Sequence, residues 1–142
     1  MTKKQISANP LNRRDAMKLG GGAAAFLMSG AATQAFAAAV EQCNGVGACR
    51  KVGLGTMCPS YMATRDEEDS TRGRANALRM AMSGQLGDDD LTSDRIEEVL
   101  SLCLSCKACK TECPNAVDMS KLTADVTQMR YNKRGTPLGV KL

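Results

Sequence analysis

Apolar side chains in the C-terminal two thirds of the chain recur every three or four residues, which is the spacing of one face of an α-helix. The segment from Thr71 to Ser83 is rich in good helix formers, and Gly84 follows where a helix end favours glycine. A second face begins near Asp94, which has the spacing of an N-terminal capping pair with Glu97. Its apolar members are Ile96, Val99, Leu100 and Cys103.

A third helical face follows, and Gly135 interrupts it. Its apolar members are Met119, Leu122, Val126 and Met129. No stretch alternates polar and apolar residues for the length of a strand, so the pattern predicts an all-α domain. The acidic runs 66–69 and 88–90 are interpreted as solvated loops, with the steering of a partner as the alternative.

The N-terminal segment has the layout of an export signal. Arg13 and Arg14 precede a Gly/Ala-rich apolar run, and Ala35-Phe36-Ala37 offers a small-x-small cleavage site. The segment resembles a twin-arginine (Tat) signal peptide, with Ala16 where Phe is usual. We therefore expect a signal at 1–37, cleaved near Ala37 after export by the Tat machinery, and a periplasmic domain at 38–142. An amphipathic helix and an uncleaved signal that tethers the protein to the membrane are the alternatives.

Charge separates these two parts of the chain. The net charge is +4, and residues 1–37 carry all of it, because the rest of the chain balances its basic and acidic side chains. A neutral domain has no basic surface for nucleic acid. Tyr61 and Tyr131 are the only aromatic residues after position 37, so we expect stabilisation from more than an apolar core.

The seven cysteines fall into two groups. The second group has the spacing C-x2-C-x2-C-x3-C-P of bacterial ferredoxins, which favours iron–sulfur over zinc, and consists of Cys103, Cys106, Cys109 and Cys113. The first group consists of Cys43, Cys49 and Cys58. On the same template Val46 takes the place of the second cysteine, and eight residues instead of three separate Cys49 from Cys58-Pro59.

In two-cluster ferredoxins the fourth cysteine of each group binds the other cluster. Applied here, this rule predicts a four-thiolate site for [4Fe-4S] at Cys58, Cys103, Cys106 and Cys109. It leaves a three-thiolate site at Cys43, Cys49 and Cys113, which suits [3Fe-4S] or a second [4Fe-4S] with an oxygen ligand on its fourth iron. A single-cluster domain and a disulfide scaffold are the alternatives; the odd number of cysteines disfavours the scaffold.

Helices between the two cysteine groups exclude the compact β-rich ferredoxins, and the arrangement resembles the α-helical ferredoxin fold. The iron–sulfur subunit of succinate dehydrogenase has a similar C-x5-C pattern with an aliphatic residue at the missing position. Its site holds a three-iron cluster, which implies the same cluster here.

A closer resemblance rests on three motifs that occur in order. They are Cys43-Asn44-Gly45-Val46-Gly47-Ala48-Cys49, Met57-Cys58-Pro59-Ser60-Tyr61 and Ser70-Thr71-Arg72-Gly73-Arg74-Ala75. The motifs look like the iron–sulfur section of the FAD-linked D-2-hydroxyacid dehydrogenases. They are more distantly similar to the iron–sulfur subunits of glycolate oxidase and anaerobic glycerol-3-phosphate dehydrogenase.

The resemblance implies electron transfer from a flavoprotein dehydrogenase through the clusters to quinone, by way of a quinone-reducing membrane protein, or to another carrier. Since the chain has no His, no Gly-rich dinucleotide loop and no nucleophile with a base, we expect no independent turnover. A second hypothesis is a binding module in which the clusters serve as folding staples. Arg72 and Arg74 are expected either to raise a cluster potential or to pair with the acidic run 66–69.

Overall fold

The computed structural model describes residues 30, 32–53, 55–86 and 90–140. The chain divides into two compact units, Met1–Gln34 and Ala35–Leu142. Arg13 and Arg14 of the predicted export signal lie outside the described residues. No helix in the described part is both long enough and apolar enough to cross a membrane.

The second unit consists of helices and turns, and its described residues contain no strand, which agrees with the all-α prediction. After a helical segment at 35–41, the longer helices are α2 (Pro59–Thr64), α3 (Thr71–Met82), α4 (Asp94–Ser101), α5 (Ala108–Glu112) and α6 (Met119–Arg134). Three 3-10 turns accompany them: η1 (Ala48–Arg50), η2 (Glu67–Asp69) and η3 (Leu138–Val140).

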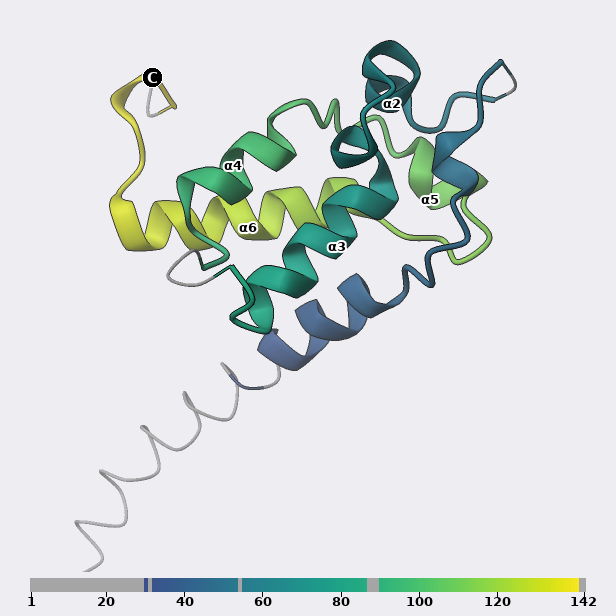
Figure 1. Ribbon diagram of the computed structural model, residues 1–142. Helices are drawn as coiled ribbons and strands as arrows, with labels where there is room; N and C mark the ends of the chain where they lie inside the picture. Colours follow the sequence, from purple (N-terminus) through teal and green to yellow (C-terminus); the bar gives the residue numbers. More distant parts are fainter. Residues whose placement is uncertain (1–29, 31, 54, 87–89, 141–142) are drawn as a thin grey trace, which may run out of the picture. The chain divides into compact units, whose positions relative to one another are not determined.

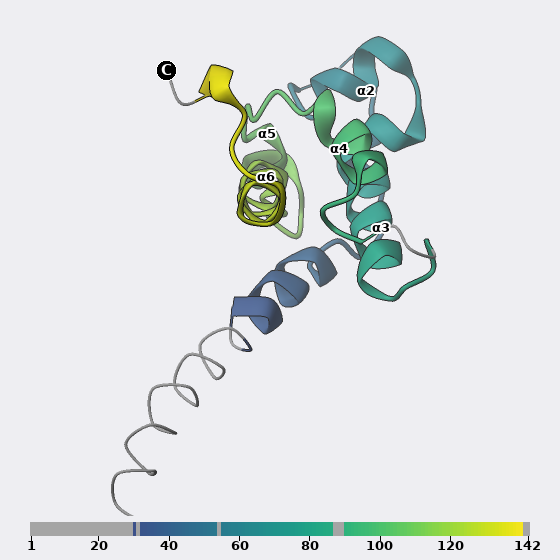
Figure 2. The ribbon, with the colours of Figure 1, turned by 90° about the vertical axis from the view of Figure 1, so that its left-hand side faces the viewer.

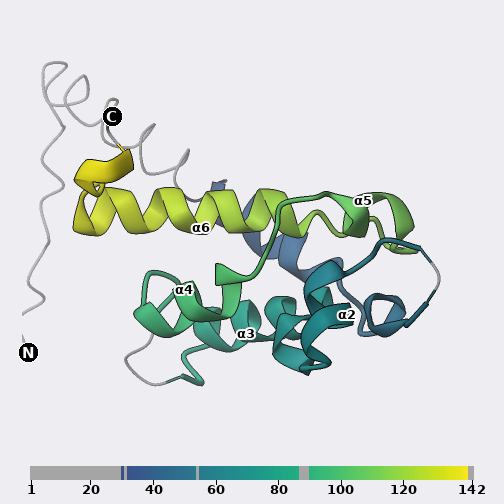
Figure 3. The same ribbon diagram turned by 90° about the horizontal axis from the view of Figure 1, so that it is seen from above.

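The helices of the second unit form two layers (Figure 1). Helix α3 packs against α4, and α6 runs beside this pair, as the view along α6 shows (Figure 2). Seen from above, α5 lies beyond the N-terminal end of α6, and α2 lies near the start of α3 (Figure 3). The two longest of these helices, α3 and α6, therefore begin at the same end of the unit, where the cysteine loops lie.

The core lies between these layers and the helical segment 35–41. Its largest fully buried apolar side chains are Val40, Met57, Leu78, Ile96, Val117, Met119 and Leu122. Phe36, which lies within the predicted export signal, is also part of this core and is only 5% exposed. The folded unit therefore uses an aromatic side chain that lies before the predicted cleavage site.

The helix ends explain why these segments begin and stop where they do. Ser70 caps α3 by accepting a hydrogen bond from the backbone N–H of Gly73, and Asp118 caps α6 in the same way. Gly84 has a φ of +71°, and the backbone bond from Gln85 N–H to the carbonyl of Met80 completes a Schellman motif after α3. The predicted helix end at Gly84 is therefore confirmed.

The cap of α4 differs from the prediction. Ser93 is the N-cap, because its hydroxyl accepts a hydrogen bond from the N–H of Ile96, and Asp94 is the first helical residue. Asp94 instead pairs with Arg130 and Arg134 of α6, and these hydrogen bonds lower the pKa of its carboxyl group. The side chain thus fastens α4 to α6 instead of capping its own helix.

The acidic run 66–69 is not the solvated loop that was expected. Its last three residues form η2, which packs against α2, α3 and α4. Gly73 makes this contact possible, because a Cβ at that position would lie 1.9 Å from the carbonyl oxygen of Glu67. The close approach places η2 directly over the start of α3.

Candidate metal centre

All seven predicted ligands lie in the described part of the chain, and all are free thiols. Four are buried: Cys43, Cys49, Cys58 and Cys109. Cys103 and Cys113 are half-buried, whereas Cys106 is exposed. The thiols therefore lie within the packed end of the unit, with one exposed member in the second loop.

The two cysteine loops share a backbone pattern. Gly45 and Gly47 of the first loop have φ angles of +79° and +76°. Sixty positions later, Ser105 and Lys107 of the second loop have φ angles of +52° and +60°, although neither is a glycine. A left-handed residue begins η1 after the first loop and α5 after the second.

This shared pattern aligns Cys43 with Cys103 and Cys49 with Cys109. Val46 then corresponds to Cys106, and both side chains are exposed. Two non-glycine residues held in the left-handed region indicate that this backbone shape is required by the loop. The two loops thus have the same backbone shape, and the exposed position that holds a thiol in the second loop holds an alkyl group in the first.

Cys113 ends α5 next to its own group, where its backbone N–H donates to the carbonyl of Cys109, and its side chain also lies beside the first group. One cavity is lined by Cys43, Cys49 and Cys113 together, and Val46 and Arg72 also line it. Around the second group, burial is the main cause that raises the pKa of Cys109, and charge repulsion from Cys103 adds to it. Ser60, two residues after Cys58, donates a hydrogen bond to the carbonyl of Leu102, next to Cys103. The exchange of fourth ligands and the complete ligand sets stay a prediction.

Backbone N–H groups at the starts of the long helices face two of the thiols. The N–H of Arg72 in α3 lies 3.4 Å from Cys49 Sγ, and those of Met119 and Ser120 in α6 bond to Cys109. Burial raises the pKa of both thiols, and these N–H groups oppose that effect. Because iron binds the thiolate, donors at this place stabilise the form that a cluster requires.

Sequence reasoning missed a tether between the two cysteine groups. Glu112 accepts hydrogen bonds from the N–H and hydroxyl of Thr56, at 2.7 and 2.5 Å, and forms an ion pair with Lys51. The ion pair and these hydrogen bonds lower the pKa of Glu112 to about 2. These bonds therefore hold the loop between Cys49 and Cys58 beside Cys113. Thr56 and Glu112 are 56 positions apart, so no local sequence pattern indicates their contact.

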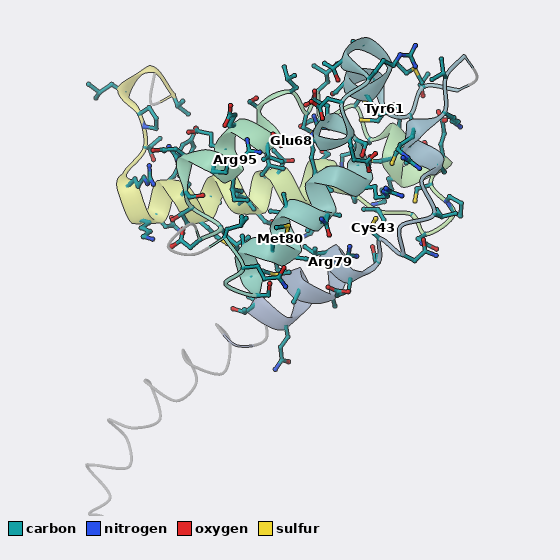
Figure 4. All side chains as sticks on the ribbon, in the orientation of Figure 1. Cys43, Tyr61, Glu68, Arg79, Met80 and Arg95 are labelled. Atoms are coloured by element: carbon teal, nitrogen blue, oxygen red, sulfur yellow. The ribbon has the colours of Figure 1, made fainter. Side chains whose placement is uncertain are left out.

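Arg79 is a second residue that sequence reasoning missed. Its guanidinium, on α3, donates to the backbone carbonyls of Val40 and Cys43 and pairs with Glu41 (Figure 4). These bonds fix the start of the first cysteine loop against α3. An arginine in an amphipathic helix gives no signal of such a role.

The donor chemistry of this end suits iron–sulfur clusters, whose iron atoms take thiolate ligands. Within the described residues, no three Cys, Asp or Glu side chains lie close enough to hold one ion. A cluster binds each thiolate through a different iron atom, so its cysteines need not converge on a point. Two loops of matching shape, with free thiols and backbone donors around them, fit such groups.

Comparison with known proteins agrees with this geometry. Residues 12–117, well over half of the chain, match the model of a family described as the 4Fe-4S dicluster domain. The chain belongs to the 4Fe-4S dicluster domain family. The matched range of this dicluster domain begins inside the predicted export signal and includes all seven cysteines.

Curated relatives of the dicluster domain include D-2-hydroxyglutarate dehydrogenase of Pseudomonas putida, 26% identical over 137 residues, covering 74% of this chain and 14% of that protein. The glycolate oxidase iron-sulfur subunit of Escherichia coli is 34% identical over 82 residues, covering 57% of this chain and 19% of that protein. The chain thus spans less than a fifth of the length of these relatives. No solved structure matches it.

Proposed function

We propose that this domain is an electron-transfer protein that carries two iron–sulfur clusters. It takes electrons from a flavoprotein dehydrogenase and passes them to quinone, through a quinone-reducing membrane protein, or to another carrier. The two loops of matching backbone shape carry this proposal. The names of the relatives support it, since one is an iron-sulfur subunit of an oxidase and the other a dehydrogenase.

The proposed cluster assignment follows the exchanged ligand sets. Cys58, Cys103, Cys106 and Cys109 hold a [4Fe-4S] cluster. Cys43, Cys49 and Cys113 hold a [3Fe-4S] cluster, or a [4Fe-4S] cluster whose fourth iron has an oxygen ligand. When bound, such clusters supply one-electron oxidation and reduction at potentials that charge and hydrogen bonding adjust.

The protein's own residues bury the clusters and stabilise their negative charge. The N–H groups that begin α3 and α6 face Cys49 and Cys109. Cys106 and Val46 lie at the exposed side of their loops, so electrons have a short path to the surface there. We expect electron transfer without independent turnover.

Iron analysis and EPR spectroscopy of the anaerobically purified protein test the proposal. We expect about seven irons per chain, an oxidised three-iron signal, and a cubane signal after reduction, as the ligand count requires. Both signals should return through repeated cycles of dithionite and a mild oxidant. About four irons and no three-iron signal would contradict the two-cluster assignment.

A structural role for the clusters is the second candidate. The observation that favours it is that Cys43, Cys49, Cys58 and Cys109 belong to the hydrophobic core itself, so cluster assembly would contribute to folding. Reversible reduction at potentials that flavins reach separates the two candidates. A staple needs no accessible redox couple, and clusters that cannot be cycled would favour it.

We further propose export through the Tat pathway to the periplasm, with Phe36 retained. Cleavage after Ala37 would remove Phe36 from the core, and loss of such a buried aromatic side chain costs about 3–5 kcal/mol. We therefore expect the N-terminus of the exported, cluster-bound protein to lie before Phe36. The uncleaved signal that tethers the protein to the membrane meets this condition. Intact-mass measurement after cell fractionation checks this, and an N-terminus at Ala38 in the folded protein would contradict it.

A further inference from the structure

Arg74 is a fully buried charged side chain, only 1% exposed, on the first turn of α3. A buried guanidinium is costly unless its N–H groups are bonded. Its Nε donates to the carbonyl of Val99 at 3.1 Å, and its Nη2 lies 3.4 Å from Asp69 Oδ1. Its Nη1 donates to Cys58 Sγ at 3.6 Å. One arm of the fork is therefore directed at a predicted cluster ligand.

Arg72 differs from Arg74 in how it reaches the cysteines. Its side chain is about one-third exposed and pairs with Glu67 at 2.7 Å. It meets Cys49 through its backbone N–H, which any side chain at this position would keep. Of the two arginines that the sequence singles out, Arg74 is the one whose side chain bonds to a cysteine sulfur. The expected pairing with the acidic run is present for both.

Asp69 shares the surroundings of Cys58. Its carboxylate pairs with Arg74, while its backbone carbonyl accepts a hydrogen bond from Cys58 Sγ at 3.4 Å. The Asp69 side chain is 15% exposed. The ion pair is thus almost entirely removed from water. Charges in such a buried position are screened least. The sulfur faces the positive member of this pair directly.

We propose that Arg74 is a positioning residue that holds the Cys58 thiolate and raises the reduction potential of the cluster bound by that thiolate. The inference rests on the proposed electron-transfer function. Reduction adds one electron to the cluster and makes the thiolates more negative, so a hydrogen-bonded cation stabilises the reduced form. Asp69 offsets part of this charge and therefore lowers the potential.

Redox titration of the loaded protein, followed by the EPR signal of the reduced cubane, tests the inference. R74K keeps the charge but loses the planar fork, so we expect a lower midpoint potential. D69N keeps the size of the side chain and removes its charge, so we expect a higher midpoint potential. R95Q is the matched control, since Arg95 is exposed and pairs with Glu68 and Glu98 (Figure 4). Its potential should stay unchanged.

The opposite shifts distinguish this role from a structural one. A purely structural ion pair would lose thermal stability in both variants and leave both potentials at the wild-type value, which would overturn the inference. If R74K does not assemble the cubane, the direction of the D69N shift decides alone. Failure of the wild-type protein to cycle would instead refute the electron-transfer function, and the inference with it.

Discussion

Replacing Val46 by Cys should convert the proposed three-iron site into a second complete cubane. The first loop already has the left-handed residues that the second loop uses to present Cys106, and Val46 occupies the corresponding exposed position. A thiol there would complete four thiolates, and the iron content should rise by about one atom per chain. EPR should show loss of the oxidised three-iron signal and two interacting reduced clusters.

V52C is the matched control for this gain. Val52 is as exposed as Val46, at 59% against 60%, but it lies between Cys49 and Cys58, outside the loop from Cys43 to Cys49. The additional thiol in V52C should remain reactive toward alkylating reagents and leave the three-iron signal in place. If V46C behaved in the same way, the alignment of the two loops would be wrong.

Serine substitutions at Cys58 and Cys113 should remove different clusters. Because Cys113 lines the cavity of Cys43 and Cys49, C113S should lose the three-iron signal and keep the cubane. Because the segment after Cys58 is bonded to the residue before Cys103, C58S should lose the cubane and keep the three-iron signal. Each variant should lose most of the corresponding signal per chain, since one thiolate of a small set is missing.

The two serine variants control for each other, since each removes one sulfur from a Cys-Pro sequence. The reverse pattern, with C58S lacking the three-iron signal, would show that each group keeps its own fourth cysteine. Loss of both signals in both variants would show that the clusters assemble only together. Circular dichroism separates that outcome from unfolding, because an unfolded variant would also lose its helical signal.

Local sequence patterns predict much of this domain. The apolar faces and Gly84 located α3 and α6, because periodicity and end signals act within a few residues. The second cysteine group could be recognised from the sequence because its members lie close together along the chain, in one short loop. The sequence could not distinguish Ser93 from Asp94 as the cap of α4, since both residue types cap helices and the ion pair of Asp94 with the distant Arg130 leaves no local pattern.

Other features depend on contacts that no local pattern records. Phe36 follows a Gly- and Ala-rich run, so its sequence surroundings indicate a signal, whereas its burial depends on α3 and its neighbours. The bonds of Glu112 to Thr56 join residues far apart in the chain. Arg74 was singled out for its charge, but its contact with Cys58 required the fold of η2 and α3.

The tether between Thr56 and Glu112 also sets an order of events during synthesis. The N–H and hydroxyl of Thr56 bond to a carboxylate that the ribosome adds 56 residues later. While the chain is being made, the loop before Cys58 therefore lacks the contact that holds it beside the last cysteine. A messenger truncated before codon 112 would leave this loop open, so the cysteine-bearing end is completed only after Glu112 has been translated.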